Sequence, residues 1–386
     1  MVRRVAVLGV GLTSFGVRPE AGWKKLVCEA MNDAVLDAKI DTSQIQIGYV
    51  GCSQPNIIEQ VPIGNLVSQF TGLNPIGFSC TSEQCSCGQV AIQNAFLAIR
   101  SGVYDLALVI GFDKMSDAYD LRNLMSPNMD DYEKYARFGS SAIGLGLWYK
   151  LHLRAHGEPT REQLAQYAVY ARKMARKNPK AFYYDSPKIT VKDVLEAPTV
   201  VEPLGALDAT RFVLDGAGAM ILASEQVAKK YRDDLVYITG ISYKNDCIYQ
   251  YNDPTYIFMP GLKSAAEEGY RMAGIGPQDL DFLCLHDCWA FFAPVELEAI
   301  GICADGEAGH FIEDGEIEIG GRCPCATDGG IYGRGHPPGA SGLANGVEAV
   351  TQIRGLAGDR QVKQAKKSLS VMIGASSRSI VIYEGE

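Results

Sequence analysis

Three stretches of the sequence carry side chains that could do nucleophilic and acid–base chemistry. In the first, residues 79–88 hold Cys80, Cys85 and Cys87 just before the apolar run 90–99. This pattern predicts a buried helix that begins at Cys85, where free backbone N–H groups and a partial positive charge favour a thiolate. Cys85 is therefore a candidate nucleophile. The alternative is a small, buried and inert apolar residue.

The other two stretches each contribute a histidine. His286, Asp287 and Cys288 follow one another where an apolar strand gives way to a helix, and functional groups collect at such strand ends. His336 lies within the glycine-rich segment 329–342. So many glycines indicate a backbone bent tightly to present an imidazole at a helix entrance. A histidine at a strand end can also be purely structural, and His286 alone does not decide between the two.

A metal site is the rival interpretation of these groups. Two Cys-x-Cys pairs, Cys85 with Cys87 and Cys323 with Cys325, could bind zinc together with two histidines. Structural zinc usually shows Cys-x-x-Cys pairs, so we expect no metal. The cysteines number eleven, and no export signal precedes them, so we expect reduced thiols.

Size and composition set the broad class. A chain of 386 residues is expected to form at least two subdomains. The net charge of −9 argues against a general nucleic-acid binder. No run of about 18 apolar residues occurs, so we expect no membrane span. The N-terminal residues 1–9 are typical of a first strand rather than a signal peptide. We therefore expect a cytoplasmic protein.

Short apolar runs alternate with helical periods, which is the pattern of a layered α/β protein. The first half is expected to contain strands at 5–10, 47–52, 76–80, 106–111 and 217–223, and helices at 24–39, 61–71 and 85–100. The second half repeats this rhythm, with strands at 235–241, 280–285, 369–373 and 379–383, and helices at 262–273 and 340–356. We expect a pseudo-duplication.

The segment 116–214 is too long to be a structureless loop, so we expect an inserted cap region. Thr160 and Gln163 spell a capping box ahead of the periodic stretch 164–174, which predicts a helix there. The predicted organisation is an N-terminal half (1–115 and 215–230), the insertion 116–214, and a C-terminal half (231–386).

Five segments in one order resemble the thiolase superfamily over nearly the whole chain. They are Cys85-Ser86-Cys87-Gly88, Gly111-Phe112-Asp113-Lys114-Met115, Asp215-Gly216-Ala217-Gly218-Ala219, His286-Asp287-Cys288-Trp289 and Gly335-His336-Pro337. The fourth is similar to the His-Asp-Cys motif of the sterol-carrier-protein and archaeal branches. The resemblance implies the five-layer αβαβα fold and a dimer in which the segment of Met115 approaches the neighbour's pocket.

The sequence departs from the family in two places. The last glycine-rich turn, Gly374-Ala375-Ser376, lacks the second catalytic cysteine of many degradative thiolases, so Cys288 would take that role. The family's Asn-Pro-Ser is replaced by Ala326-Thr327-Asp328. The second departure bears on the substrate more than on the chemistry.

The resemblance also implies a mechanism. His336 takes the proton of Cys85, and the thiolate attacks the 3-oxo carbon of a 3-oxoacyl-CoA. Backbone N–H groups of Cys85 and Gly374 hold the oxyanion, and His286 with His336 meets the enolate oxygen. Cys288 protonates the leaving carbon and then activates coenzyme A, which is a co-substrate; no tightly bound cofactor is expected.

The sequence gives weaker signals for the coenzyme A site, the acyl group and the partners. The basic residues of the insertion are either a solvated face or a site for the phosphates of coenzyme A; they are Arg172, Lys173, Arg176, Lys177 and Lys180. Nearby aromatic residues are expected to be mainly core but leave room for an aryl group; they are Trp289, Phe291, Phe292, Phe182, Tyr183 and Tyr184. Relatives of this branch include acetoacetyl-CoA thiolases and benzoylsuccinyl-CoA thiolase, often with a small zinc-ribbon and OB-fold partner subunit, so a separate partner is expected here.

Two other functions remain open at this point. One is a 3-oxoacyl synthase that works only in the condensing direction, against which Cys288 argues. The other is a non-catalytic acyl-CoA-binding subunit, against which the joint presence of Cys85, His286, Cys288 and His336 argues.

Overall fold

The protein, in a computed structural model that describes residues 3–118, 141–246 and 258–386, is built around a nine-stranded mixed sheet. Its strand order is β3-β2-β4-β7-β1-β8-β11-β10-β9. The strands are β1 (Val5–Leu12), β2 (Ile47–Gly51), β3 (Phe78–Thr81), β4 (Leu106–Lys114), β7 (Asp215–Ser224), β8 (Val236–Asn245), β9 (Phe282–Cys284), β10 (Lys367–Gly374) and β11 (Ser377–Gly385).

The two halves of the sheet repeat one topology, which confirms the expected pseudo-duplication. In the N-terminal half, β2 and β4 are parallel, and β4, β7 and β1 then pair antiparallel in turn. In the C-terminal half, β9 and β10 are parallel, and β10, β11 and β8 pair antiparallel in turn. The halves join where Val5–Val7 of β1 pairs with Val236–Ile238 of β8.

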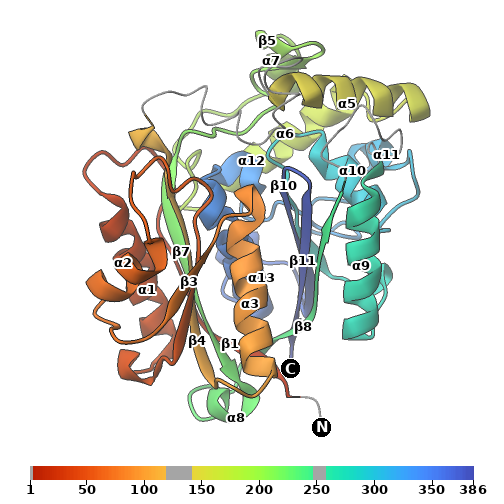
Figure 1. Cartoon of the computed structure of the whole chain (residues 1–386). Coiled ribbons are helices and arrows are strands. Elements are labelled where there is room, and N and C mark those ends of the chain that lie inside the picture. The colour runs from red at the N-terminus through yellow and green to blue at the C-terminus, as the bar shows by residue number, and fades with distance from the viewer. Residues whose placement is uncertain (1–2, 119–140, 247–257) are drawn as a thin grey trace.

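Helices on both sides of each half-sheet complete the five layers (Figure 1). The central layer is α3 (Cys87–Arg100) and α13 (Pro338–Ile353). Outside the N-terminal half lie α1 (Trp23–Ala38) and α2 (Ile63–Phe70), and outside the C-terminal half lie α9 (Pro260–Ala273) and α10 (Phe292–Ala299). The short helices are α8 (Glu225–Ala228), α11 (Ala308–Glu313) and α12 (Gly330–Arg334). The fold is the thiolase fold that the sequence predicts.

Glycine lets the central helices approach the sheet closely. A Cβ on Gly88 of α3 would lie 2.3 Å from the carbonyl oxygen of Gly339 in α13, and a Cβ on Gly111 of β4 would lie 2.2 Å from the same oxygen. A methyl group fits neither space. The starts of α3 and α13 are therefore held together, and these are the segments that carry Cys85 and His336.

The segment between β4 and β7 contains α5 (Ser141–His156), α6 (Arg161–Ala175), α7 (Val191–Leu195) and a small hairpin, β5 (Thr199–Val201) with β6 (Leu204–Gly205). The capping box at the start of α6 is confirmed, because the Gln163 N–H donates to the Thr160 hydroxyl while the Gln163 side chain accepts from the Thr160 N–H. The domain boundaries that we placed around this segment stay a prediction.

Two local expectations are wrong. Helix α3 begins at Cys87 rather than Cys85, because a 3-10 turn at Gln84–Ser86 precedes it and Gln84 adopts a positive φ of 50°. Strand β9 ends at Cys284, so His286 lies beyond the strand rather than next to its last residue. Among the described helices, none combines the length and the apolar composition needed to cross a bilayer.

Candidate active site

Cys85 lies in the 3-10 turn between β3 and α3. The turn is closed by the Ser86 N–H, which donates to the Glu83 carbonyl oxygen over 3.1 Å. Cys85 is half-buried, whereas Cys87, two residues later and the first residue of α3, is fully buried. The turn therefore separates an accessible thiol from a structural one.

His336 is the partner of Cys85, although 251 residues separate them. Its Nε2 lies 3.2 Å from the Cys85 Sγ, and its Nδ1 lies 2.8 Å from the Ser341 hydroxyl oxygen. The Ser341 hydroxyl donates its single proton to the Pro337 carbonyl oxygen over 2.9 Å. Its oxygen must therefore accept from Nδ1–H, which leaves the lone pair of Nε2 free to accept the thiol proton. Ser341 thus fixes His336 in the tautomer of a general base for Cys85.

His286 approaches the same thiol from the other half of the molecule. A ring nitrogen of His286, a ring nitrogen of His336 and the Cys85 Sγ lie within 4.8 Å of one another, and the two imidazoles meet edge to face with centroids 5.3 Å apart. The His286 N–H donates to the buried Glu296 carboxylate over 2.8 Å, which fixes the backbone there. Among the described residues, the buried Nδ1 of His286 has no hydrogen-bond partner.

Cys288 and Gly374 border this group. Cys288 is buried. Burial, followed by a charge on Cys85, raises the pKa of the Cys288 thiol well above that of an ordinary thiol. Gly374, at the end of β10, lies against the Cys85 turn: a Cβ there would be 2.3 Å from the Glu83 carbonyl oxygen and 2.9 Å from the Ser86 hydroxyl oxygen. The structure therefore brings the predicted catalytic residues to one place.

The electrostatics correct the expected state of the nucleophile. Burial, followed by the nearby Asp113 carboxylate, raises the pKa of the Cys85 thiol to about 12. Burial, followed by the charge of Arg378, lowers the pKa of His286 to about 3. Burial, followed by the neighbouring His286, lowers the pKa of His336 well below its usual value. The expectation of a resting thiolate at a helix start is wrong because desolvation dominates. The resting pair is a neutral thiol and a neutral imidazole.

Asp113 connects the segment that follows β2 to the start of α13, the helix next to His336. Its carboxylate accepts hydrogen bonds from the Ser53 N–H and hydroxyl at 3.1 and 2.6 Å, and from the Gly339 N–H at 2.5 Å. Burial raises the pKa of this carboxyl to about 6. Asp113 therefore fixes the first turn of α13, close to His336, against the end of β2.

Asp287 has a similar role on the opposite side. Its carboxylate accepts from the Tyr167 hydroxyl at 2.7 Å and from the Ile331 N–H at 2.8 Å. A Cβ on Gly330, which has a φ of 60°, would lie 2.2 Å from that carboxylate, so the position requires glycine. Asp287 therefore supports the glycine-rich loop rather than joining the reacting groups.

A buried ion pair completes the support of this loop. Arg334 is paired with Asp328 through one guanidinium nitrogen and donates through another to the Asn345 side-chain oxygen over 2.7 Å. Asp328 also accepts from the Gly330 N–H. The departure from the family at residues 326–328 thus supplies the counterion of the arginine next to His336.

Aromatic rings flank both imidazoles. The Phe212 ring lies edge-on to His336, with centroids 5.6 Å apart, and the Phe292 ring lies edge-on to His286 at 5.9 Å. Trp289, Phe291 and Phe292 are buried, which confirms their expected role as core. Sequence reasoning missed Phe212, which no motif marks, and Ser341, which lies inside the glycine-rich segment but carried no signal of its contact.

The five basic residues of the insertion do not share one partner. Arg172 is buried, with its guanidinium 3.4 Å from the centroid of the Tyr183 ring, and Arg176 is half-buried. Lys173 pairs with Glu318, Lys177 donates to the Asp359 carbonyl oxygen, and Lys180 pairs with Asp33. Their role toward coenzyme A stays a prediction.

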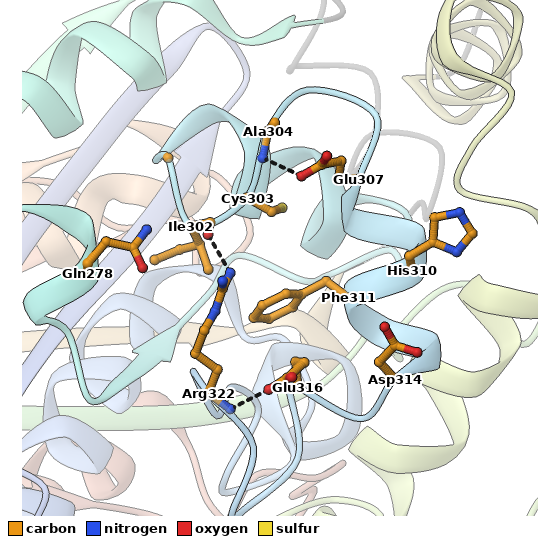
Figure 2. A pocket seen from close by; sticks show the side chains of 11 residues that line it. Gln278, Ile302, Cys303, Ala304, Glu307, His310, Phe311, Asp314, Glu316 and Arg322 are labelled. Carbon is orange, nitrogen blue, oxygen red and sulfur yellow. Dashed lines mark hydrogen bonds between the residues drawn. The ribbon is translucent and has the colours of Figure 1, made fainter.

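A cavity of about 690 Å³ lies away from this site, between the end of α10, α11 and the segment around Arg322 (Figure 2). Phe311 and Arg322 form one wall, with the guanidinium 4.6 Å from the ring centroid. None of its lining residues is one of the predicted catalytic residues.

Comparison with known proteins identifies the family. A family model described as "Thiolase, N-terminal domain" matches residues 5–226, and one described as "Thiolase C-terminal domain-like" matches residues 240–384. The chain belongs to the thiolase family. It is an acyltransferase of the thiolase type.

Individual relatives agree with the branch that the His-Asp-Cys motif indicates. The thiolase chain is 31% identical over 384 residues to an acetyl-CoA acetyltransferase of Methanothermobacter thermautotrophicus, covering 99% of both chains. It is 30% identical over 405 residues to human sterol carrier protein 2, covering 98% of this chain and 71% of the relative. A solved structure titled "Ltp2-ChsH2(DUF35) aldolase" matches with a TM-score of 0.86 and 25% identity over 99% of this chain and 98% of that one. The narrower expectation of a benzoylsuccinyl-CoA thiolase stays a prediction.

Proposed function

We propose that this protein exchanges acyl groups between a 3-oxoacyl-CoA and coenzyme A through a covalent acyl-Cys85 intermediate. The observation that carries the proposal is the 3.2 Å contact between the Cys85 Sγ and the His336 Nε2, with Nδ1 held by Ser341. A nucleophile, a base and a group that orients the base form the arrangement required for covalent catalysis.

In the first half-reaction, Cys85 gives its proton to His336 and attacks the 3-oxo carbon. The oxyanion that forms is met by the backbone N–H groups of Cys85 and Gly374. The C2–C3 bond then breaks, which leaves the acyl group on Cys85 and the enolate of the shortened CoA thioester. In this proposal His286 meets the enolate oxygen together with His336, and its support is the buried Nδ1 of His286, which has no hydrogen-bond partner among the described residues. Cys288 delivers its proton to C2.

In the second half-reaction, the Cys288 thiolate takes the proton of coenzyme A. The CoA thiolate attacks the acyl group, Cys85 leaves, and His336 returns the proton that it accepted. All groups regain their starting protonation states, so the cycle needs neither an oxidant nor a metal. Run backwards, the same steps form a carbon–carbon bond by Claisen condensation.

The substrate is the finer part of the proposal. Similarity to an acetyl-CoA acetyltransferase over the full length favours acetoacetyl-CoA. The rings of Phe212 and Phe292 beside the imidazoles favour a flat or aryl acyl group such as that of benzoylsuccinyl-CoA. A panel of 3-oxoacyl-CoA thioesters, with and without an aromatic group, distinguishes these substrates by the rate of cleavage that depends on coenzyme A.

Intact-mass spectrometry tests the function itself. Incubation with a 3-oxoacyl-CoA in the absence of free coenzyme A should add one acyl group, located on Cys85 by peptide mapping. The Cys85→Ala variant should gain none while keeping its melting temperature. An acyl group on another residue, or full thiolysis by Cys85→Ala, would rule the assignment out.

Similarity to the solved aldolase favours a second candidate, the retro-aldol cleavage of a 3-hydroxyacyl-CoA. In that reaction His336 would remove the proton of the 3-hydroxyl group, and no acyl-enzyme would form. The two reactions differ in stoichiometry: thiolysis consumes one coenzyme A per cleavage, and retro-aldol cleavage consumes none. The accessible Cys85 beside His336 favours thiolysis.

The assembly is also a proposal. The similar aldolase was solved together with a second component, which its title names as ChsH2(DUF35). We therefore propose a separate small partner subunit, as well as a homodimer of this chain located in the cytoplasm. Light scattering of the purified chain, alone and after co-expression with a small DUF35-type protein, tests the assembly.

A further inference from the structure

The catalytic group has a second property that acyl transfer does not use. In the part of the chain that the structure describes, Cys85, His286 and His336 are the one group of potential ligands whose donor atoms all lie within 4.8 Å of one another. One thiol and two imidazoles form a ligand set that suits zinc. Cys87, Cys323 and Cys325, the other cysteines considered as ligands, lie outside this group.

The three donors are already arranged for a metal. The donor atoms around a tetrahedral zinc lie about 3.3–3.6 Å apart, so the observed spacing needs to shrink by only about 1 Å. Ser341 accepts from the Nδ1–H of His336, so the lone pair of Nε2 points toward the Cys85 Sγ. A hydrogen bond on the far nitrogen is the usual support of a histidine ligand.

We propose that Cys85, His286 and His336 bind one Zn²⁺ ion in the substrate-free enzyme and that this ion is a reversible inhibitor. Zinc replaces the proton of the Cys85 thiol, which passes to the solvent, and a water molecule completes the coordination. No atom changes oxidation state. The soft thiolate and the imidazoles select zinc over magnesium or calcium.

Zinc and the acyl group compete for the same sulfur. Cys85 is half-buried, whereas His286 and His336 are buried, so its sulfur is the donor of the set that is most accessible to an ion or to an acyl-CoA. A bound ion blocks attack on the 3-oxo carbon, and an acylated Cys85 has no thiolate for the ion. The inhibition of acyl transfer by zinc therefore rests on the proposed function, but the binding of zinc does not.

Cobalt(II) is the probe, because a thiolate ligand gives it a charge-transfer absorption band. The purified chain, free of chelator and coenzyme A, should show this band with a stoichiometry of one, and zinc should displace it. Cys85→Ala should lose the band. Cys80→Ser, which removes an exposed thiol outside the group, should keep it. A band of equal strength in Cys85→Ala would overturn the proposal, because the thiolate ligand would then lie elsewhere.

A second variant tests the geometry without removing a ligand. Ser341→Ala deletes the support of His336, and its affinity for cobalt and zinc should fall by about 10–100-fold, which is typical for the loss of such a partner. Unchanged affinity in Ser341→Ala would contradict the proposed role of His336 as a ligand. Circular dichroism spectra confirm that each variant is folded.

Failure of this proposal and failure of the proposed function give different results. Metal binding is measured without any substrate, so a chain that binds cobalt through Cys85 but is never acylated contradicts the thiolase mechanism alone. A chain that is acylated on Cys85 but shows no thiolate band contradicts the zinc site alone. If both hold, zinc should inhibit thiolysis, a chelator should restore the activity, and prior acylation should prevent the cobalt band.

Discussion

Ser341 and Cys85 lie on opposite sides of the His336 imidazole. The Ser341 oxygen is 2.8 Å from Nδ1, and the Cys85 sulfur is 3.2 Å from Nε2. Because Ser341 also donates to the Pro337 carbonyl, it can only accept from the ring. A hydroxyl in the first turn of α13 therefore decides which nitrogen of His336 can take the proton of the nucleophile.

Replacement of Ser341 by alanine tests this arrangement. We expect kcat to fall by up to about 100-fold, because part of the His336 population adopts the tautomer that cannot accept the thiol proton. KM should change little. Ser186→Ala is the matched control, since the Ser186 hydroxyl also donates to a backbone carbonyl, at 2.7 Å, away from the site. Equal kcat values for the two variants would exclude a positioning role for Ser341.

The raised pKa of Cys85 predicts how the free enzyme reacts with iodoacetamide. A thiol whose pKa is raised to about 12 is protonated at neutral pH, so the alkylation rate should keep rising from about pH 7 to about pH 10. The low pKa of His336 keeps it an unprotonated base across this range. His336→Ala should therefore react more slowly than the wild type at every pH below 10. A plateau below about pH 8 in the wild type would show that the resting state is a thiolate.

Much of the fold is predictable because local patterns agree with the tertiary packing. Apolar runs without alternation predict strands such as β4 and β7, which are buried on both faces between helices. The capping box at Thr160 predicts the helix that follows it, and Thr160 is the N-cap of α6. Five motifs in family order predict that Cys85, His286 and His336 share a site. Each of these signals can be read either from a few neighbouring residues or from the order of the motifs along the chain.

The rest depends on contacts between distant segments. Gln84 has no intrinsic preference for a positive φ, so the 3-10 turn that delays the start of α3 leaves no local signal. The prediction that Cys85 rests as a thiolate is wrong. A helix start, which lowers the pKa of a thiol, can be read from the sequence, whereas desolvation, which raises the pKa more strongly here, depends on packing. Ser341 and Phe212 contact His336 through tertiary geometry that no spacing rule describes.

The ion pair between Arg334 and Asp328 should be important for stability. Arg334→Met leaves the buried Asp328 carboxylate without its counterion, so the free energy of unfolding should fall by about 3–5 kcal/mol. The double variant Arg334→Met with Asp328→Asn removes both charges and should lose less than the single variant. Urea denaturation of both proteins measures the difference. A double variant that is less stable than Arg334→Met would show that the pair is not the main interaction of Arg334.

Gly374 should tolerate no side chain. A Cβ there would approach the Glu83 carbonyl oxygen to 2.3 Å, so Gly374→Ala must displace β10 or the turn that carries Cys85. We expect a loss of about 1–3 kcal/mol in stability and a larger loss in kcat, because the nucleophile and the proposed oxyanion site both move. Gly22→Ala is the control, since a Cβ at that position has open space around it. Wild-type kcat in Gly374→Ala would exclude a contribution of this residue to the oxyanion site.

The basic residues of the insertion should divide into two classes. Arg172 is buried under Tyr183, so Arg172→Ala should lower the stability by about 0.5–2 kcal/mol through the lost stacking. Lys173 and Lys177 are exposed, so changing each to glutamate should raise the KM for coenzyme A by about tenfold at low salt, and less at high salt, if they attract its phosphates. Lys229→Glu makes the same charge change at the C-cap of α8, and α8 lies at the opposite end of the molecule from α6 (Figure 1). Equal KM values for coenzyme A in the Lys173→Glu, Lys177→Glu and Lys229→Glu variants would assign the exposed lysines of the insertion to a solvated face.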